Sequence, residues 1–133
     1  MLNVSKTTLM RSCDKNMTEK IGIPDAVLME NAANAVAQSI KKHTAGRKNG
    51  IRVFILIGPG NNGGDGLALL RILTAEGYNA EGILLFEPIQ SKKDEQSAAL
   101  PRSSAELNYQ IAINLGLPLS NDINRLNTCR ESD

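Results

Sequence analysis

The sequence predicts an α/β domain built on a parallel sheet, and three consecutive segments carry this prediction. Residues 51–57 read IRVFILI, an almost unbroken apolar run typical of a strand buried on both faces of a parallel sheet. Leucine and isoleucine then recur at helical spacing over residues 65–77, and a second strand is predicted over residues 81–86. A strand, a helix and a strand within about 36 residues indicate a right-handed βαβ unit.

Length and composition support one such domain. The 133 residues can bury a sizeable core but are too few for two ordinary domains. Apolar residues make up 41% of the chain and aromatic residues only 3%, so the core must consist of aliphatic side chains, as in helices packed on a sheet. Basic and acidic side chains number 15 and 14. This balance argues against nucleic acid or an anionic membrane as the main partner and is compatible with a small-molecule ligand.

Nothing in the sequence suggests export or membrane insertion. The N-terminal residues carry scattered charges and no uninterrupted apolar run, unlike a signal peptide or a spanning helix. Cys13 and Cys129 lie far apart and match neither a zinc-binding spacing nor a CxxC motif, so no disulfide framework is expected. We therefore expect a cytoplasmic protein without membrane contact.

Two helices are predicted ahead of the apolar strand. The first runs from a cap at Ser5 to Gly22, and the second opens at Pro24 and Asp25, where a proline and a carboxylate suit the first turn. The second helix ends in a basic turn, so His43, the single histidine, is predicted to be a surface residue without a role. The apolar positions of the two helices recur at spacings of three and four: Leu9, Met10, Cys13 and Met17 in the first, and Leu28, Ala32, Val36 and Ile40 in the second.

Beyond the second strand the pattern weakens. Residues 88–101 are polar and flanked by prolines, so they are predicted to form a loop. Helical spacing resumes over residues 104–115, but no apolar period remains after Pro118. We therefore predict that the folded domain spans residues 1–118 and that residues 119–133 form a frayed or disordered tail.

Residues 58–66, GPGNNGGDG, are predicted to form a phosphate-binding loop. Five glycines in nine residues permit positive φ and the close approach of a phosphate group. The N–H groups and the dipole of the following helix would attract an anion without any basic side chain. Asn61 and Asn62 can donate to a phosphate or turn their carbonyl oxygens towards a hard cation. Asp65 is expected to accept backbone N–H bonds that hold the loop, or to face sugar hydroxyls or a cation.

Two other interpretations of this segment remain open. One is a plain glycine-rich turn followed by a helix cap. The other is the dinucleotide loop of a redox enzyme, because Gly58, Gly60 and Gly63 satisfy G-x-G-x-x-G and Glu87 follows the second strand as a candidate ribose ligand. A Walker P-loop is not supported, since no lysine–serine pair follows the glycines.

The chain resembles the NAD(P)H-hydrate epimerases in two segments, GIPDAVLMENAANAV at residues 22–36 and GPGNNGGDGLALLRIL at residues 58–73. The resemblance extends in order and spacing from about Met10 to Leu115, and NNGGDG after a buried strand is much narrower than a generic glycine motif. It implies a Rossmann-like three-layer fold, with helices on both faces of a parallel sheet. It also implies an isomerase that interconverts the R and S epimers of hydrated NADH or NADPH, which is a metabolite-repair reaction.

The same resemblance implies roles for individual residues. Asn62 would be a ligand of the family's potassium ion, for which oxygen donors are better suited than for zinc or copper. The stretch implied to contact the substrate is Asn61, Asn62, Gly63, Gly64 and Asp65.

Four other residues are assigned by pattern alone. Glu30 and Asn31 belong to the family pattern, although they equally suit the polar face of an apolar helix. Met10 and Met29 are predicted to be core residues instead of site residues.

The resemblance ends after Pro118. The family's domain continues into further strands with a second glycine-containing loop and an acidic residue near the hydrated ring, and nothing in residues 119–133 resembles them. We therefore expect a sheet truncated at its C-terminal end, whose unpaired strand edges favour homo-oligomers. The sequence nominates no acid–base catalyst. The alternative function is a non-catalytic nucleotide-binding or protein-interaction module on the same fold.

Overall fold

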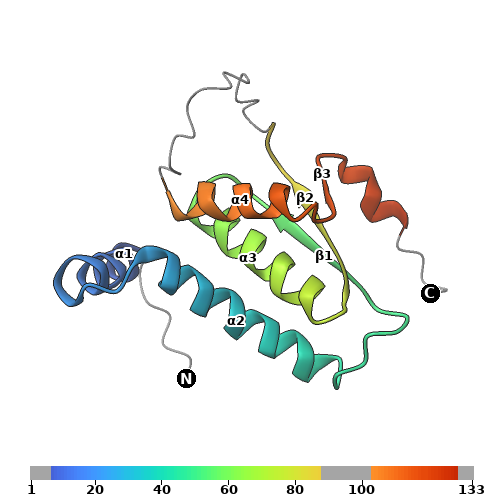
Figure 1. Ribbon diagram of the computed structural model, residues 1–133, viewed down its shortest axis with the longest axis horizontal. Helices are drawn as coiled ribbons and strands as arrows, with labels where there is room; N and C mark the ends of the chain where they lie inside the picture. The colour runs from blue at the N-terminus through green and yellow to red at the C-terminus, as the bar shows by residue number, and fades with distance from the viewer. Residues whose placement is uncertain (1–6, 88–102, 129–133) are drawn as a thin grey trace.

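The computed structural model describes residues 7–87 and 103–128, which form a three-stranded parallel sheet with helices around it (Figure 1). The strands lie in chain order, and β1 pairs with β2 from Arg52 beside Asn79 to Ile57 beside Leu84. The predicted α/β class with a parallel βαβ unit is confirmed, and the second strand begins two residues earlier than expected. The strands are β1 (Arg52–Ile57), β2 (Asn79–Leu84) and β3 (Leu119–Ser120).

Three predicted helical ranges, 5–22, 24–43 and 104–115, are helical where the structure describes them, but the helix predicted over residues 65–77 begins at Asn61 and a helix over residues 123–128 was not predicted. Ser103 caps α4, because its hydroxyl accepts a hydrogen bond from the Glu106 N–H at 3.1 Å. Within the described ranges, no helix is both long and apolar enough to cross a bilayer. The helices are α1 (Thr7–Asn16), the π-helix η1 (Met17–Ile21), α2 (Asp25–His43), α3 (Asn61–Ala75), α4 (Ser104–Asn114) and the 3-10 helix η2 (Ile123–Thr128).

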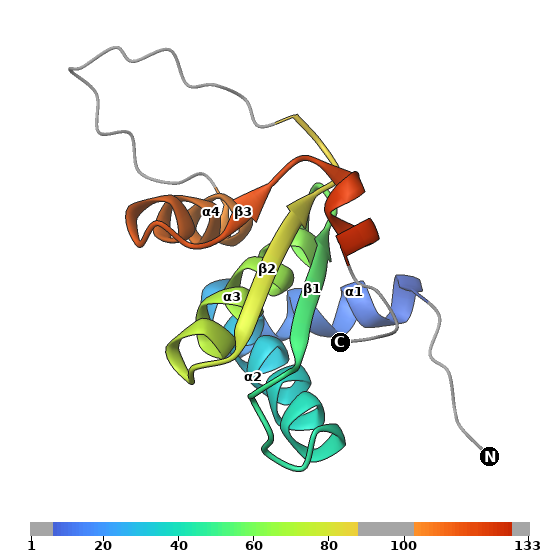
Figure 2. The same cartoon turned by 90° about the vertical axis from the view of Figure 1, so that its right-hand side faces the viewer.

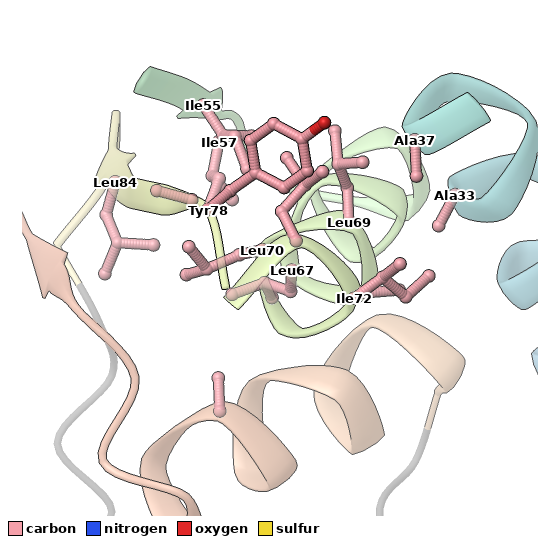
Figure 3. Packing of buried hydrophobic residues seen from close by; sticks show 14 residues of the cluster. Ala33, Ala37, Ile55, Ile57, Leu67, Leu69, Leu70, Ile72, Tyr78 and Leu84 are labelled. Carbon is pink, nitrogen blue, oxygen red and sulfur yellow. The ribbon is translucent and has the colours of Figure 1, made fainter. Parts of the chain in front are cut away.

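Helix α3 lies at the centre of the molecule. It packs on β1 and β2 and is flanked by α2 and α4 (Figure 1). A helix enclosed in this way must be apolar on most sides, which explains the dense leucine pattern of its sequence. Leu70 of α3 and Ile57 of β1 are fully buried in the resulting core (Figure 3), and so is Leu73 of α3.

Helix α2 buries a different stripe from the predicted one. Its buried residues are Met29, Ala33 and Ala37, each one position after a predicted core residue, whereas Val36 is 47% exposed. The small side chains of Ala33 and Ala37 face α3 (Figure 3) and allow the two helices to approach closely. Close helix packing therefore selects the alanine face over the valine face.

The far face of the sheet is less covered than the sequence predicted. Ile55 and Ile57 of β1 point to α3 and are buried, but Leu56 on the opposite face is 53% exposed. In the part of the chain that the structure describes, η2 lies beside the strands on the side away from α3 (Figure 2). Its Arg125 pairs with Glu81 of β2, and its Thr128 accepts from Arg52 of β1. The prediction of a strand buried on both faces is therefore wrong for β1 as described.

The N-terminal helix forms but packs on little. No side chain of α1 is buried, and Met10 is 52% exposed, so its prediction as a core residue is wrong, whereas Met29 is 5% exposed and belongs to the core. Gly22 ends this region with a φ of 84°, as the predicted helix stop requires. The predicted cap at Ser5 and the loop at 88–101 lie outside the described residues.

Residues 119–128 are ordered elements where the sequence predicted a tail. Leu119 lies beside Gly82 in the sheet, and the Gly82 N–H donates to the carbonyl of Pro118 at 2.9 Å. A Cβ at Gly82 would lie 2.7 Å from Leu119 Cδ2, so the glycine makes room for this strand. A two-residue strand has no measurable apolar period, which is why sequence reasoning missed it. Residues 129–133 of the predicted tail, with Cys129, lie outside the described residues.

Candidate functional site

The glycine-rich segment follows β1 at the carboxyl edge of the sheet. Its loop is shorter than predicted, because α3 already begins at Asn61 and leaves Gly58, Pro59 and Gly60 as the connection. Within the segment, Gly60 alone has positive φ, at 89°. The predicted nine-residue loop is therefore a three-residue turn followed by the first turns of a helix.

Close packing explains the remaining glycines better than backbone freedom does. A Cβ built on Gly63 would lie 1.9 Å from the carbonyl oxygen of Gly58, and a Cβ on Gly64 would lie 2.5 Å from Met29 Sδ and 2.9 Å from Ala105 Cα. No side chain fits at such distances without movement of the backbone. Gly63 and Gly64 thus allow the start of α3 to touch β1, α2 and α4 together.

The start of α3 presents unused hydrogen-bond donors. Gly64 is the first residue of the turn whose N–H is satisfied, by the Gly60 carbonyl at 3.2 Å. The N–H groups of Asn61, Asn62 and Gly63 find no acceptor among the residues described. Because the helix dipole adds partial positive charge at the same point, this turn is suited to bind an anion.

The starts of two other helices lie beside this turn. A Cβ added at Gly64 would meet both Met29, in the first turns of α2, and Ala105, in the first turn of α4. Asn108 of α4, 7% exposed, donates to Met29 Sδ at 3.2 Å and to the Ser104 carbonyl at 2.9 Å, which ties α4 to α2. The positive ends of three helices therefore converge at one edge of the sheet.

Asp65 contributes a half-buried carboxylate to the site. Burial raises the pKa of the Asp65 carboxyl above its ordinary value of 3.8, and the nearby carboxylates of Asp25 and Asp14 raise it further. Across the described ranges no N–H or hydroxyl donates to this carboxylate, so the expected role in holding the loop through backbone bonds is wrong. Its other expected partners, a sugar hydroxyl or a cation, are compatible with this position.

The two asparagines of the segment are solvent-exposed. The side chains of Asn61 and Asn62 make no hydrogen bond to any described residue, so their amide groups can serve a ligand. Gly63 and Gly64 are buried and could offer only their backbone atoms. The five predicted site residues thus lie at consecutive positions at the start of α3. Asn61 and Asn62 are exposed, Asp65 is half-buried, and Gly63 and Gly64 are buried.

Glu30 and Glu87 have structural partners. Glu30 of α2 forms an ion pair with Arg71 of α3, whereas Asn31 is exposed, as expected for the polar face of the helix. Glu87 is exposed and accepts from the Asn121 amide at 3.3 Å. Sequence reasoning missed Asn108 because only the packing of α4 against α2 makes it part of the site.

The described residues form a parallel α/β sheet with a glycine-rich turn and free helix N–H groups at its carboxyl edge, the position where open α/β sheets carry their ligand sites. The family profile "YjeF-related protein N-terminus" matches residues 25–123. The chain belongs to this family. The matched range includes β3, which agrees with the ordered segment found beyond Pro118.

Individual relatives support the assignment. An NAD(P)H-hydrate epimerase of Oenococcus oeni is 33% identical over 115 residues, which cover 86% of this chain and 49% of the relative. An NAD(P)H-hydrate epimerase of Leuconostoc mesenteroides is 43% identical over 79 residues, covering 59% of this chain and 34% of the relative. The crystal structure of yeast ynu0 superposes with a TM-score of 0.67 at 30% identity, over 91% of this chain and 48% of the yeast chain. The chain thus spans about half or less of the length of these relatives.

Proposed function

We propose that this chain carries the phosphate-binding part of an NAD(P)H-hydrate epimerase, an isomerase that interconverts the R and S epimers of hydrated NADH or NADPH. The observation that carries the proposal is the set of unused N–H groups of Asn61, Asn62 and Gly63 at the carboxyl edge of the sheet. Names of relatives in the family supply the reaction class.

In this proposal the start of α3 receives the pyrophosphate of the dinucleotide. The three N–H groups donate to phosphate oxygens, and the Asn61 amide can add a further donor. Gly63 contributes its backbone N–H, whereas the N–H of Gly64 is already bonded to the Gly60 carbonyl, so Gly64 contributes only the close packing that positions this turn. Asp65 lies one turn further, where a carboxylate accepts from ribose hydroxyls more favourably than it would meet a phosphate.

A potassium ion is the metal that the family implies, and we propose Asn62 as one of its ligands. The exposed amide oxygen of Asn62 and the carboxylate of Asp65, which accepts no hydrogen bond from the residues described, are the kind of hard oxygen donors that such a cation takes. No cluster of three or more His, Cys, Asp or Glu side chains suited to a metal occurs in the described ranges, which argues against a transition metal. A bound potassium ion would supply positive charge beside the pyrophosphate.

A binding experiment tests the ligand assignment. Calorimetric titration of residues 1–133 with ADP-ribose and with hydrated NADPH is expected to show binding that weakens roughly tenfold in Asn61→Leu, which removes an amide donor at the helix start. Gln38→Leu removes an exposed amide from α2 and is the matched control. If Asn61→Leu titrates like the parent chain, the assignment is wrong.

A chimera tests the reaction. In the chimera, the 115 residues of the Oenococcus oeni relative that match this chain are replaced by the corresponding residues of this chain. Interconversion of the two hydrate epimers is followed by chromatography. We expect turnover within about tenfold of the parent relative, because the transplanted part supplies an equivalent phosphate site. A folded chimera without activity would contradict the proposal. Net oxidation of NADPH would instead support the redox-type alternative, and an absence of nucleotide binding would support the interaction module.

A further inference from the structure

The edge of the sheet opposite the candidate site carries a hollow that the proposed function does not use. It has a volume of about 520 Å³ and is lined by residues 48–52 with Gly77 and Asn79, at the amino ends of β1 and β2. A second hollow of about 430 Å³, lined by residues 46–49, adjoins it through Lys48 and Asn49. We refer to the two together as the basic hollow.

The lining includes basic residues and no acidic one. Three of the nine lining residues, Arg47, Lys48 and Arg52, are basic, and none of the described residues that line the basic hollow is acidic. The Arg52 guanidinium also lies 4.9 Å from the centre of the Phe54 ring. The neighbouring carboxylate of Glu76 is already paired with Lys41 at 3.0 Å. The hollow therefore has a local positive charge although the whole chain has a formal net charge of +1.

These cations are held in place and still have donors to spare. Lys48 Nζ donates to the carbonyl of Glu76 and lies 5.5 Å from the centre of the Tyr78 ring. Arg47 Nε donates to the Thr44 carbonyl at 3.3 Å, and Arg52 Nη1 donates to Thr128 Oγ1 at 3.0 Å. A lysine has three N–H donors and an arginine five, so each group keeps several unused. Side chains that are already ordered lose less entropy when they bind a ligand.

The backbone adds donors at the same place. Ile51 turns back on the chain, with its N–H donating to the Lys48 carbonyl at 3.4 Å, and Gly50 takes a φ of 74° in this turn. The N–H groups of Lys48, Asn49 and Gly50 have no acceptor among the described residues. Three consecutive backbone donors beside three cationic side chains match an oxyanion with several acceptor oxygens.

We propose that the basic hollow binds the phosphate group of a small phosphorylated molecule, at a site separate from the one at the carboxyl edge. A phosphate group accepts from Arg and Lys side chains and from backbone N–H groups at once, and these are the donors of the lining. A metal ion is excluded as the ligand by the cationic lining. Nucleic acid needs a longer basic stripe than three side chains around one hollow.

Two-dimensional amide NMR of residues 1–133 with inorganic pyrophosphate as the probe tests the proposal. We expect saturable shifts of the Lys48, Asn49 and Gly50 amides, independent of any shifts of Asn61, Asn62 and Gly63. The two sets of amides separate this site from the proposed nucleotide site, so that either can fail alone. Shifts confined to residues 61–63 would overturn the proposal, and so would linear, unsaturable shifts at 48–50, which indicate an adventitious ion only.

Variants sharpen the test. Lys48→Gln is expected to weaken pyrophosphate binding at residues 48–50 roughly tenfold, because it removes a charge-assisted hydrogen bond. Lys42→Gln removes the same charge from the exposed end of α2 and is expected to leave pyrophosphate binding unchanged. Asn49→Asp places a negative charge in the hollow at a side chain without partners among the described residues, and is expected to abolish binding. Gln38→Glu adds the same charge on the outside of α2 as its control. Unchanged binding in Asn49→Asp would overturn the proposal.

Discussion

The two edges of the sheet differ in the groups that they offer to bind an anion. At the carboxyl edge the starts of α2, α3 and α4 converge, and the donors are the backbone N–H groups of Asn61, Asn62 and Gly63. At the amino edge α2 and α3 end, and side chains such as Lys48 satisfy their last carbonyls. The helices that connect parallel strands all point in the same direction, so their positive dipole ends lie at the carboxyl edge. Positive potential at the amino edge therefore has to come from basic side chains.

This difference has a consequence for mutation. A backbone site depends on helix geometry, so it is sensitive to the packing of Gly63 and Gly64 and insensitive to the loss of any one charge. A side-chain site depends on individual cations such as Lys48 and is sensitive to charge reversal and to salt. The carboxyl edge also carries Asp65, whose pKa is raised by burial and then by the nearby carboxylates of Asp25 and Asp14.

The largest expected effect comes from a substitution that disrupts the packing at the carboxyl edge. Gly63→Ala places a Cβ 1.9 Å from the Gly58 carbonyl oxygen and is expected to destabilise the protein by about 3 kcal/mol, with loss of ligand binding. Gly66→Ala is the matched control on the same helix, because its Cβ would lie 3.2 Å or more from its neighbours. Urea unfolding measures both variants. Equal stability of the two would show that the tight junction does not limit this edge.

The second prediction concerns what the carboxyl edge can do alone. Epimerisation needs an acid–base group beside the reacting carbon, and phosphate binding cannot replace it. Residues 1–133 are therefore expected to interconvert the hydrate epimers more than roughly tenfold more slowly than a full-length relative. Chromatography of the two epimers against a buffer blank measures this. Turnover within tenfold of the relative would mean that a residue of this chain, with Asp65 first to be tested, transfers the proton.

The third prediction tests whether a bound cation contributes to ligand binding at the carboxyl edge or whether hydrogen-bond donors alone account for it. If Asn62 binds potassium, ADP-ribose affinity is expected to be about fivefold higher in potassium than in a bulky organic cation, and Asn62→Leu should remove the difference. Calorimetry in the two salts measures it. Asn114→Leu, at the end of α4, is the control for loss of an exposed amide. The same affinity in both salts for the parent chain would rule out a role for the cation.

The smallest expected effect is electrostatic. Because the folded pKa of Asp65 is raised above its ordinary value, the folded state disfavours the charged carboxylate, and stability is lost as pH rises from 3.8 through the folded pKa. Asp65→Asn is therefore expected to raise Tm slightly at neutral pH and to leave it unchanged below pH 3.8. Thermal unfolding across this pH range measures it. A lower Tm for Asp65→Asn at neutral pH would show that the carboxylate has a stabilising partner.

The sequence by itself determined the class of fold and the place of the site. The apolar run of β1, the leucines of α3 and the helical spacing of α4 predicted their structures locally, because a hydrophobic period acts within a few residues. NNGGDG marked the segment that the structure places at the carboxyl edge, although the close packing of its glycines was not predicted.

The tertiary structure decided features that the local sequence pattern does not specify. It selected Met29, Ala33 and Ala37 as the buried stripe of α2, because only the approach of α3 decides which of two adjacent apolar stripes is enclosed. It ordered Leu119 through a neighbour 37 residues earlier, Gly82, whose missing side chain leaves the space. It converted a predicted loop into the first turns of α3, since glycines that would loosen an isolated helix are here required by the contacts at Gly58, Met29 and Ala105. Each of these outcomes depends on residues distant in sequence, and the free energy of packing outweighs the local preference.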